Sequence, residues 1–319
     1  MKHSLSALAF IVSIVPLLSF GQTRTIGFYN VENLFDTLDH PTNNDDEFLP
    51  TGSYEWNSKR YWEKIAHINQ IMDSLSSPML LGMCEIENEA VVKDVIQFGN
   101  YASYEIVHYE SLDQRGIDNA LIYDPSVLKK HASGIIRFDM PAPDSPTRDI
   151  LWAKFAVKNS KDSIIAMVNH WPSRRGGEEE SEPKRMIAAE AAKAFIDSVL
   201  MANKKMKIVF MGDLNDYPTN AGPMLIAESL QPMITKESGE FCGSHNYRGE
   251  WDVLDHILVS KSMLKGKTKA KKNSGTIYSQ QFMLEEYKGD IVPFRTYGGR
   301  TYLGGYSDHF PVTISVRMK

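Results

Sequence analysis

Short apolar runs alternate with amphipathic stretches along most of this chain. Brief runs rich in β-branched and aromatic residues predict strands, and apolar residues at helical spacing predict helices. The predicted strands are Arg24–Tyr29, Met79–Cys84, Tyr104–His108, Asn119–Tyr123, Gly134–Phe138, Ile150–Val157, Ser163–Asn169, Lys207–Met211, His256–Ser260 and Val312–Val316. The predicted helices are Ser58–Ser74, Glu89–Phe98, Glu182–Met201 and Gly222–Glu228. The third helix is the clearest, because Ser181 and Pro183 lie at its start.

No linker rich in Gly or Ser, no repeat and no low-complexity tract interrupts this alternation. The chain has 319 residues, of which 42% are hydrophobic and 24% charged, so it can bury a continuous core. We therefore predict a single α/β domain over residues 22–319, with mixed strands in two packed sheets and helices outside them.

The first 21 residues have a different pattern. A basic start precedes an apolar run from Leu5 to Phe20, and the small residue Gly21 follows. This pattern is typical of a cleaved secretory signal peptide, so we predict cleavage after Gly21 and a secreted or periplasmic protein. An uncleaved membrane anchor is the alternative, although the run is short for a spanning helix and contains Pro16. No other apolar run is long enough, so we expect no membrane span in the mature chain.

The charges and cysteines narrow the picture only slightly. A formal net charge of -5 does not favour a nucleic-acid binder. It does not exclude one either, because the clustered carboxylates of a metal site would themselves add negative charge. The stretch Lys261–Lys272 holds six lysines and predicts either a solvated loop or a contact with a polyanionic substrate. Glu178–Glu180 predicts a loop that enters a helix. Cys84 and Cys242 could pair in an oxidising compartment, although Cys84 lies in an apolar run typical of a small buried residue.

Polar residues with possible chemistry lie beside the apolar runs at six places. They are Asn30 with Glu32, Glu85, Asn169 with His170, Asp213 with Asn215 and Asp216, Asp255 with His256, and Asp308 with His309. Such a number of carboxylate, amide and imidazole groups at strand ends predicts one site at the rim of the sheets. Carboxylate and amide oxygens suit a hard cation such as Mg²⁺ or Mn²⁺, whereas zinc would favour several His or Cys ligands.

The same segments resemble the ordered motifs of the endonuclease/exonuclease/phosphatase superfamily. GDLN and SDHFP together are the most specific of them. The full set is YNVEN (29–33), CEIEN (84–88), NHW (169–171), GDLND (212–216), LDHILVS (254–260) and YSDHFPV (306–312), which spans nearly the whole mature chain. The resemblance implies a four-layer α/β/β/α sandwich of two mixed sheets, with one site at their edge.

The resemblance also implies a metal site. Glu85 is expected to be the principal ligand of Mg²⁺ or Mn²⁺, and Asn30 and Asp308 are expected to complete the metal environment. Glu32 is either a residue beside the metal or a helix-capping carboxylate.

Five residues receive catalytic roles from the resemblance. Asp213 is expected to orient or deprotonate the attacking water, and Asn215 to donate to the phosphate oxygens. His309 is expected to contact the scissile phosphate while Asp255 orients it. His170 occupies a position where nucleases of the superfamily often place a catalytic or phosphate-binding histidine. His256 is expected to be structural, because alternation along a strand turns it away from Asp255.

Substrate contacts are predicted at Asn119, Arg174 and Arg248. Arg174 could clamp a phosphate or be solvated. Arg248, with Tyr247 and Trp251, could form an aromatic and cationic wall for a base, a sugar or a lipid head group.

The predicted function is metal-dependent hydrolysis of phosphate esters, with an exported nuclease as the first choice and nucleic acid as the expected substrate. A phosphodiesterase or phosphatase acting on lipid head groups or inositol phosphates is the alternative. A non-catalytic binding protein on the same scaffold is disfavoured, because Glu85, Asp213 and His309 are all present. No stable protein partner is predicted.

Overall fold

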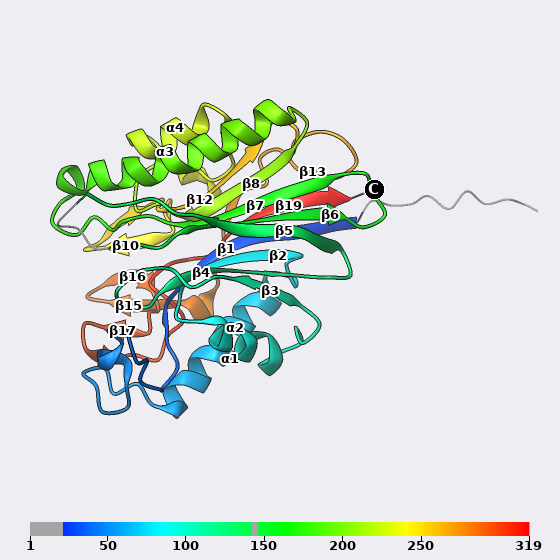
Figure 1. The fold of residues 1–319 in the computed structure, drawn as a ribbon. Coiled ribbons are helices and arrows are strands. Elements are labelled where there is room, and N and C mark those ends of the chain that lie inside the picture. Colours follow the sequence, from blue (N-terminus) through cyan, green and yellow to red (C-terminus); the bar gives the residue numbers. More distant parts are fainter. Residues whose placement is uncertain (1–21, 142–145, 319) are drawn as a thin grey trace, which may run out of the picture.

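The computed structural model describes residues 22–141 and 146–318. The predicted signal peptide, residues 1–21, lies outside the described residues. Two large sheets pack face to face, and helices cover the outer face of each (Figure 1). The fold is therefore the predicted four-layer α/β/β/α sandwich of two mixed sheets.

The first sheet has seven strands in the order β13-β19-β1-β2-β4-β3, with β14 beside β19. Helices α1 (Ser58–Ser74) and α2 (Glu89–Phe98) cover its outer face (Figure 1). The strands are β1 (Gln22–Leu34), β2 (Leu80–Ile86), β3 (Glu105–His108), β4 (Asp118–Tyr123), β13 (Lys269–Ala270), β14 (Thr276–Ile277) and β19 (Val312–Met318).

The second sheet has six strands in the order β5-β6-β7-β8-β12-β9. Helices α3 (Glu178–Ala202) and α4 (Ala221–Ala227) cover its outer face (Figure 1). The strands are β5 (Leu128–Ile136), β6 (Ile150–Val157), β7 (Ser163–His170), β8 (Lys207–Asp213), β9 (Leu230–Pro232) and β12 (Asp255–Ser260).

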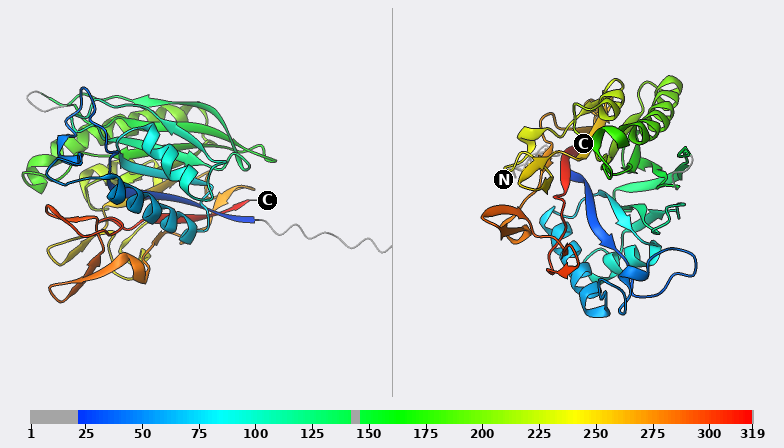
Figure 2. Two further views of the ribbon diagram at one scale, coloured as in Figure 1. Left: turned by 90° about the horizontal axis from the view of Figure 1, so that it is seen from below. Right: turned by 90° about the vertical axis from the view of Figure 1, so that its left-hand side faces the viewer.

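Three short hairpins lie outside both sheets, on the same side of the molecule (Figures 1 and 2). They pair β10 (His245–Tyr247) with β11 (Glu250–Asp252), β15 (Leu284–Tyr287) with β16 (Asp290–Pro293), and β17 (Tyr297–Gly298) with β18 (Thr301–Tyr302). Three 3₁₀ turns complete the elements, at Asp46–Phe48, Lys236–Ser238 and Gln281–Met283.

The central strands are buried on both faces, which explains why they are continuous apolar runs. On β7, Ile164 and Val168 join the core between the sheets, whereas Ile165 and Met167 pack under the helices. The sheets approach closely at Gly82, where an added Cβ would lie 2.8 Å from Met211 Sδ. Glycine at this position therefore permits the contact between the two sheets.

One expectation from the sequence is wrong, and one question that it left open is answered. Helix α3 begins at Glu178, four residues before its predicted start, so Glu178–Glu180 form its first turn and not a loop. Negative side chains are favourable there because the first turn exposes unpaired N–H groups. Cys84 is buried in the core and Cys242 is exposed, and both are free thiols. The disulfide that the sequence left open is therefore absent from the described residues.

In the part of the chain that the structure describes, no helix has both the length and the apolar character needed to cross a membrane.

Candidate functional site

The predicted residues converge because the strands that carry them end at one edge of the sandwich. In the register of the second sheet, His170 on β7 lies opposite Asp213 on β8, and Asp213 lies opposite Asp255 on β12. These three polar residues therefore form one row across neighbouring strands. On the first sheet, Asn30 pairs with Cys84, the residue before Glu85. The two rows face each other, since the Asn30 amide bonds to Asp213.

Glu85 lies on a bulge in β2. Its φ is 61°, and the pairing of β2 with β4 shifts between Cys84 and Ile86. A bulge of this kind turns one residue out of the ladder and redirects its side chain. The Oε2 atom of Glu85 accepts the Asn33 N–H at 2.9 Å. Its Oε1 atom lies 3.4 Å from Asn30 Nδ2 and faces the interior of the site.

Asp213 is a buried carboxylate at the centre of the site, with 2% of its surface exposed. Its Oδ2 accepts the Asn30 amide at 3.1 Å, and its Oδ1 accepts the Asn215 N–H at 2.9 Å. Burial raises the pKa of Asp213 to about 7. The positive charge of His309 works against this rise, and the carboxylates of Asp255 and Glu85 add to it.

The amide of Asn30 is oriented by backbone. Its Oδ1 accepts the Glu32 N–H at 3.0 Å, so its nitrogen points towards Asp213 and Glu85. In this arrangement Asn30 donates to the two carboxylates, and its role as a metal ligand stays a prediction.

His309 and Asp255 form the expected pair. His309 Nδ1 lies 2.7 Å from Asp255 Oδ2, which also accepts the Ser244 hydroxyl at 2.6 Å. The other ring nitrogen, Nε2, lies 3.9 Å from Asp213 Oδ2. Burial alone would lower the pKa of His309, but Asp255 and Asp213 outweigh it and raise that pKa well above its usual value. This imidazole is therefore a cation at neutral pH and can donate to an anionic substrate.

His170 has the opposite character. Its Nε2 lies 3.8 Å from Asp213 Oδ2 and 3.9 Å from Glu85 Oε1. Burial, followed by the charge of Arg148, lowers the pKa of His170 well below its usual value. The site therefore holds one charged and one neutral imidazole on either side of Asp213.

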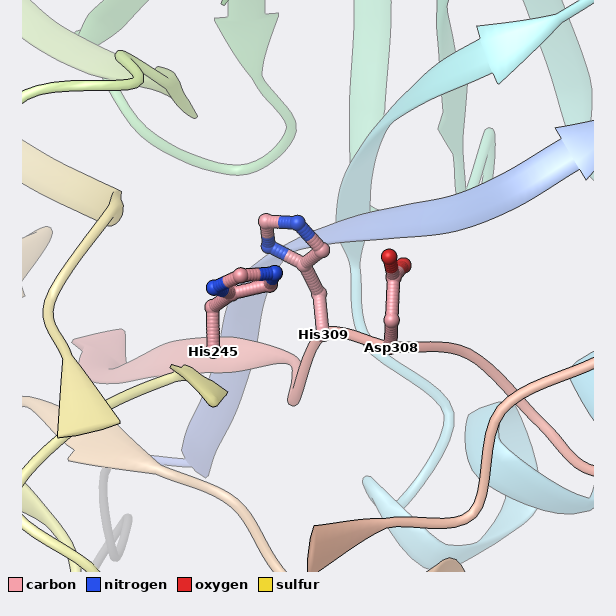
Figure 3. A group of neighbouring side chains, drawn as sticks. All are labelled: His245, Asp308 and His309. Carbon is pink, nitrogen blue, oxygen red and sulfur yellow. The ribbon is translucent and has the colours of Figure 1, made fainter. Parts of the chain in front are cut away.

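Sequence reasoning missed His245. Its ring lies 4.7 Å from that of His309, and a bridge joins the two backbones (Figure 3). His245, Asp308 and His309 each offer a ligand atom within 4.8 Å of the others. Burial, followed by the charge of His309, lowers the pKa of His245 to about 4. Only the pairing of a short hairpin brings His245 here, and no motif marks it.

Asp308 and Glu32 are tied together through Arg295. Asp308 Oδ2 lies 2.7 Å from the Arg295 guanidinium, which is 3.6 Å from Glu32 Oε1. The oxygens of Glu32 also accept the backbone N–H groups of Thr296 and Tyr297, at 2.6 and 3.3 Å. Glu32 therefore anchors the backbone around Thr296, which lies in no helix, so Glu32 does not cap a helix there. Its place beside a metal stays a prediction.

Glu85 and Asp308 are the best candidates for metal ligands. Their oxygens have the hard character that Mg²⁺ and Mn²⁺ require. The fit at Glu85 is good, because its Oε1 has only long contacts, to Asn30 at 3.4 Å and to His170 at 3.9 Å. Asp308 fits less directly, since it would have to exchange Arg295 for the ion.

The predicted substrate-binding residues lie in three different environments. Arg174 already bonds to the Tyr217 hydroxyl and to Asp252. Asn119 is buried and donates to the Asp149 carbonyl at 2.9 Å. Within the described residues, neither bonds to Glu85, Asp213 or His309. Arg248 lies at the tip of the β10–β11 hairpin over the ring of Tyr247, where it can meet a ligand.

Asn215 and Asp216 follow Asp213 in the GDLND motif but have other partners. Asn215 has a φ of 50° and donates its amide to the Trp171 carbonyl at 3.1 Å. Asp216 is fully buried and pairs with the buried Arg185 at 2.6 Å. His256 contacts the Asp216 carbonyl, which agrees with its expected structural role. The last residue of the motif therefore anchors α3 to the sheet.

Loss of the Asp216 carboxylate is expected to destabilise the protein. Asp216→Ala leaves the Arg185 guanidinium buried without a counter-charge, which costs about 3–5 kcal/mol. Asp197→Ala is the control, because it removes an exposed partner of Lys193 and should cost less than about 1 kcal/mol. Denaturant unfolding measures both values, and equal losses would show that the buried pair has no special weight.

The comparisons with known proteins agree with this geometry. The family described as Endonuclease/Exonuclease/phosphatase family matches residues 25–318. A search of curated proteins found no match. Among solved structures, a family protein from Bacteroides thetaiotaomicron is 15% identical with a TM-score of 0.60, over 94% of this chain and 99% of that one.

Two further structures share the fold. A mannosyl-6-phosphatase of Bacteroides thetaiotaomicron is 15% identical with a TM-score of 0.59, over 92% of this chain and 99% of that one. The human Nocturnin catalytic domain, solved with a bound sulfate anion, is 14% identical with a TM-score of 0.58, over 92% of this chain and 94% of that one. These structures show the shared fold, and the family match over nearly the whole chain shows that this protein belongs to the endonuclease/exonuclease/phosphatase family.

Proposed function

We propose that this protein hydrolyses phosphate esters with the help of a divalent cation, Mg²⁺ or Mn²⁺, held by Glu85 and Asp308. Enzymes of this family hydrolyse phosphate esters and generally depend on a divalent metal. The observation that carries the proposal is the buried Asp213, held by Asn30 and faced by the charged His309. A bound cation would neutralise phosphate oxygens and favour attack by water.

The chain's own residues divide the remaining work. Asp213 is placed to accept a proton from the attacking water, since its raised pKa makes it a stronger base than an ordinary aspartate. His309 donates to the phosphate, and Asp255 holds the ring in orientation and keeps it charged. Asn30 orients Asp213 through the hydrogen bond that its side-chain amide donates to Asp213 Oδ2.

For the substrate, we favour a small organic phosphate. A cavity of about 820 Å³ opens beside Asp308, which is enough for a compact ligand. A mannosyl-6-phosphatase among the similar structures supports the same choice. Nucleic acid, which the sequence favours, is the second candidate. It draws support from His170 in the site, but Arg174 is already engaged by Tyr217 and Asp252.

The stretch Lys261–Lys272, with its six lysines, gives little support to a nucleic-acid groove. Lys269 lies opposite Arg317 in the strand register, near the end of β19, whereas His309 precedes the start of that strand. The length of β19 therefore separates Lys269 from His309 by about 20 Å.

A panel of esters tests the reaction and the substrate. The purified protein is incubated with sugar phosphates, inositol phosphates, a short-chain phospholipid and supercoiled plasmid DNA, with Mn²⁺ and then with excess EDTA. We expect release of phosphate from small esters that EDTA abolishes and added metal restores. Metal-dependent nicking of the plasmid without phosphate release would move the assignment to the nuclease candidate. Hydrolysis unaffected by EDTA would contradict the proposal.

We also propose that residues 1–21 direct export and that the protein acts outside the cytoplasm without a stable protein partner. The N-terminal pattern is the support for this proposal. Expression of the full chain in a bacterial host should yield a periplasmic or secreted product that begins at Gln22. A cytoplasmic product that keeps Met1, identified by mass spectrometry, would rule out cleavage.

A further inference from the structure

The cavity beside Asp308 is built by the three short hairpins. Residues of the β10–β11, β15–β16 and β17–β18 hairpins line it, and Arg295 and Asp308 also form part of its wall. The labelled hairpin strands gather on the same side of the sandwich (Figure 1). Because Asp308 belongs to both the cavity and the site beside His309, a ligand in the cavity can place its phosphate at the site.

Two of these hairpins carry the same tip. The sequences are Tyr-Arg-Gly-Glu at 247–250 and Tyr-Lys-Gly-Asp at 287–290. In each, the cationic residue and the glycine have positive φ, 54° and 90° in the first tip and 52° and 91° in the second. Positive φ at both central positions is typical of the tight hairpin turn whose twist matches its strands. The two tips are therefore preformed.

Each tip presents a tyrosine to the cavity. Tyr247 and Tyr287 line the cavity and are both 57% exposed. The Arg248 guanidinium lies 5.1 Å from the Tyr247 ring, and the Lys288 ammonium lies 5.0 Å from the Tyr287 ring. An exposed aromatic ring with fixed backbone is a contact surface with a low entropic cost of binding. Within the described residues, neither ring belongs to the buried hydrophobic core.

The charges of the cavity wall are balanced. Three cations face three carboxylates: Arg248, Lys288, Arg295, Glu285, Asp290 and Asp308. A polyanionic strand would accept only from the cations and be repelled by the carboxylates. A lipid chain would remove water from these six charged groups without offering them hydrogen bonds, which is unfavourable. Hydroxyl groups both donate and accept, so a neutral ligand with several hydroxyls matches the wall.

We propose that this cavity binds the sugar ring of a sugar phosphate, with the carbon face of the ring against Tyr247 and Tyr287. The hydroxyls of the ring bond to the charged side chains of the hairpins, which are Arg248, Lys288, Glu285 and Asp290. This inference rests on the proposed function for the position of the phosphate. It goes further by assigning the hairpin tips as the part of the protein that selects the organic group.

Binding measurements test the inference without turnover. The Asp213→Asn variant is expected to turn over esters about 10³-fold more slowly. Calorimetry on that background can therefore compare glucose 6-phosphate with glycerol 3-phosphate, which lacks the ring. We expect the sugar phosphate to bind about tenfold more tightly, which corresponds to burying roughly 55 Å² of the carbon face of the ring. Adding Tyr247→Ala and Tyr287→Ala together should remove that difference, and Tyr287→Ala alone should reduce that difference. Tyr287→Phe keeps the ring and should preserve it, as should Tyr109→Ala, which removes an exposed tyrosine outside this cavity wall.

Several outcomes would overturn the inference. Equal affinity for the two esters would show that the cavity does not select a sugar. Equal weakening of both esters by Tyr287→Ala would indicate a structural role for the tip. Tighter binding of adenosine 5′-monophosphate than of glucose 6-phosphate, lost in Tyr287→Ala, would assign the cavity to a nucleobase. Sugar selectivity in a protein that hydrolyses no ester would contradict the proposed function but leave the cavity assignment in place.

Discussion

Replacement of Asp213 by Asn is expected to lower kcat by about 10³-fold while the fold remains intact. Asp213 is the one carboxylate that contacts Asn30 and faces both His170 and His309. An amide of the same shape can still accept the Asn30 hydrogen bond, but it cannot take a proton from water. General bases in enzymes contribute about 10²–10⁴-fold, which sets the expected loss.

Steady-state kinetics on the best ester of the panel measures this effect, and thermal unfolding checks the fold. Asp197→Asn serves as the control, because Asp197 is an exposed partner of Lys193 on α3. A turnover within threefold of the unaltered protein would show that Asp213 is not the base.

His309→Ala and Asp255→Ala should each reduce kcat/KM by about 10²-fold or more, and the double variant should lose little beyond the larger single effect. The reason is that Asp255 acts through His309, by holding Nδ1 at 2.7 Å and keeping the ring charged. Residues that act as one unit are strongly non-additive in catalysis.

A double-mutant cycle on kcat/KM gives the coupling directly. His131→Ala, at an exposed position on β5, is the control and should leave kcat/KM unchanged. Losses that multiply in the double variant would mean that the two side chains contribute independently, and the orienting role of Asp255 would have to be abandoned.

The candidate site was predictable because its residues lie at or beside the ends of strands. His170 and Asp213 follow apolar runs on neighbouring strands, so their convergence follows from local pattern once both runs lie in one sheet. The contacts of Asn30 and Glu32 were not predictable. Both depend on which backbone groups lie nearby, since Asn30 is oriented by one N–H and Glu32 holds the backbone of a segment more than 250 residues away in sequence.

The layers of the fold also follow from periodicity, but the edges do not. Strands of three residues, such as those flanking Arg248, are too short to show a period, so the hairpins of the cavity were missed. Helix α3 was predicted to begin too late because three glutamates resemble a loop, although they suit a first helical turn. His245 reaches the site only through one of those hairpins.

The most direct test of the central claim is the rate of ester hydrolysis as Mn²⁺ is added to metal-free protein and to its Glu85→Gln variant. We predict that the unaltered protein gains activity with Mn²⁺, loses it in EDTA and regains it on addition of metal. We predict that Glu85→Gln stays inactive over the same range, because the amide removes the charge of the expected principal ligand. Full activity without metal, or equal activation of both proteins, would contradict the assignment of this site as a metal-dependent phosphoesterase centred on Glu85 and Asp213.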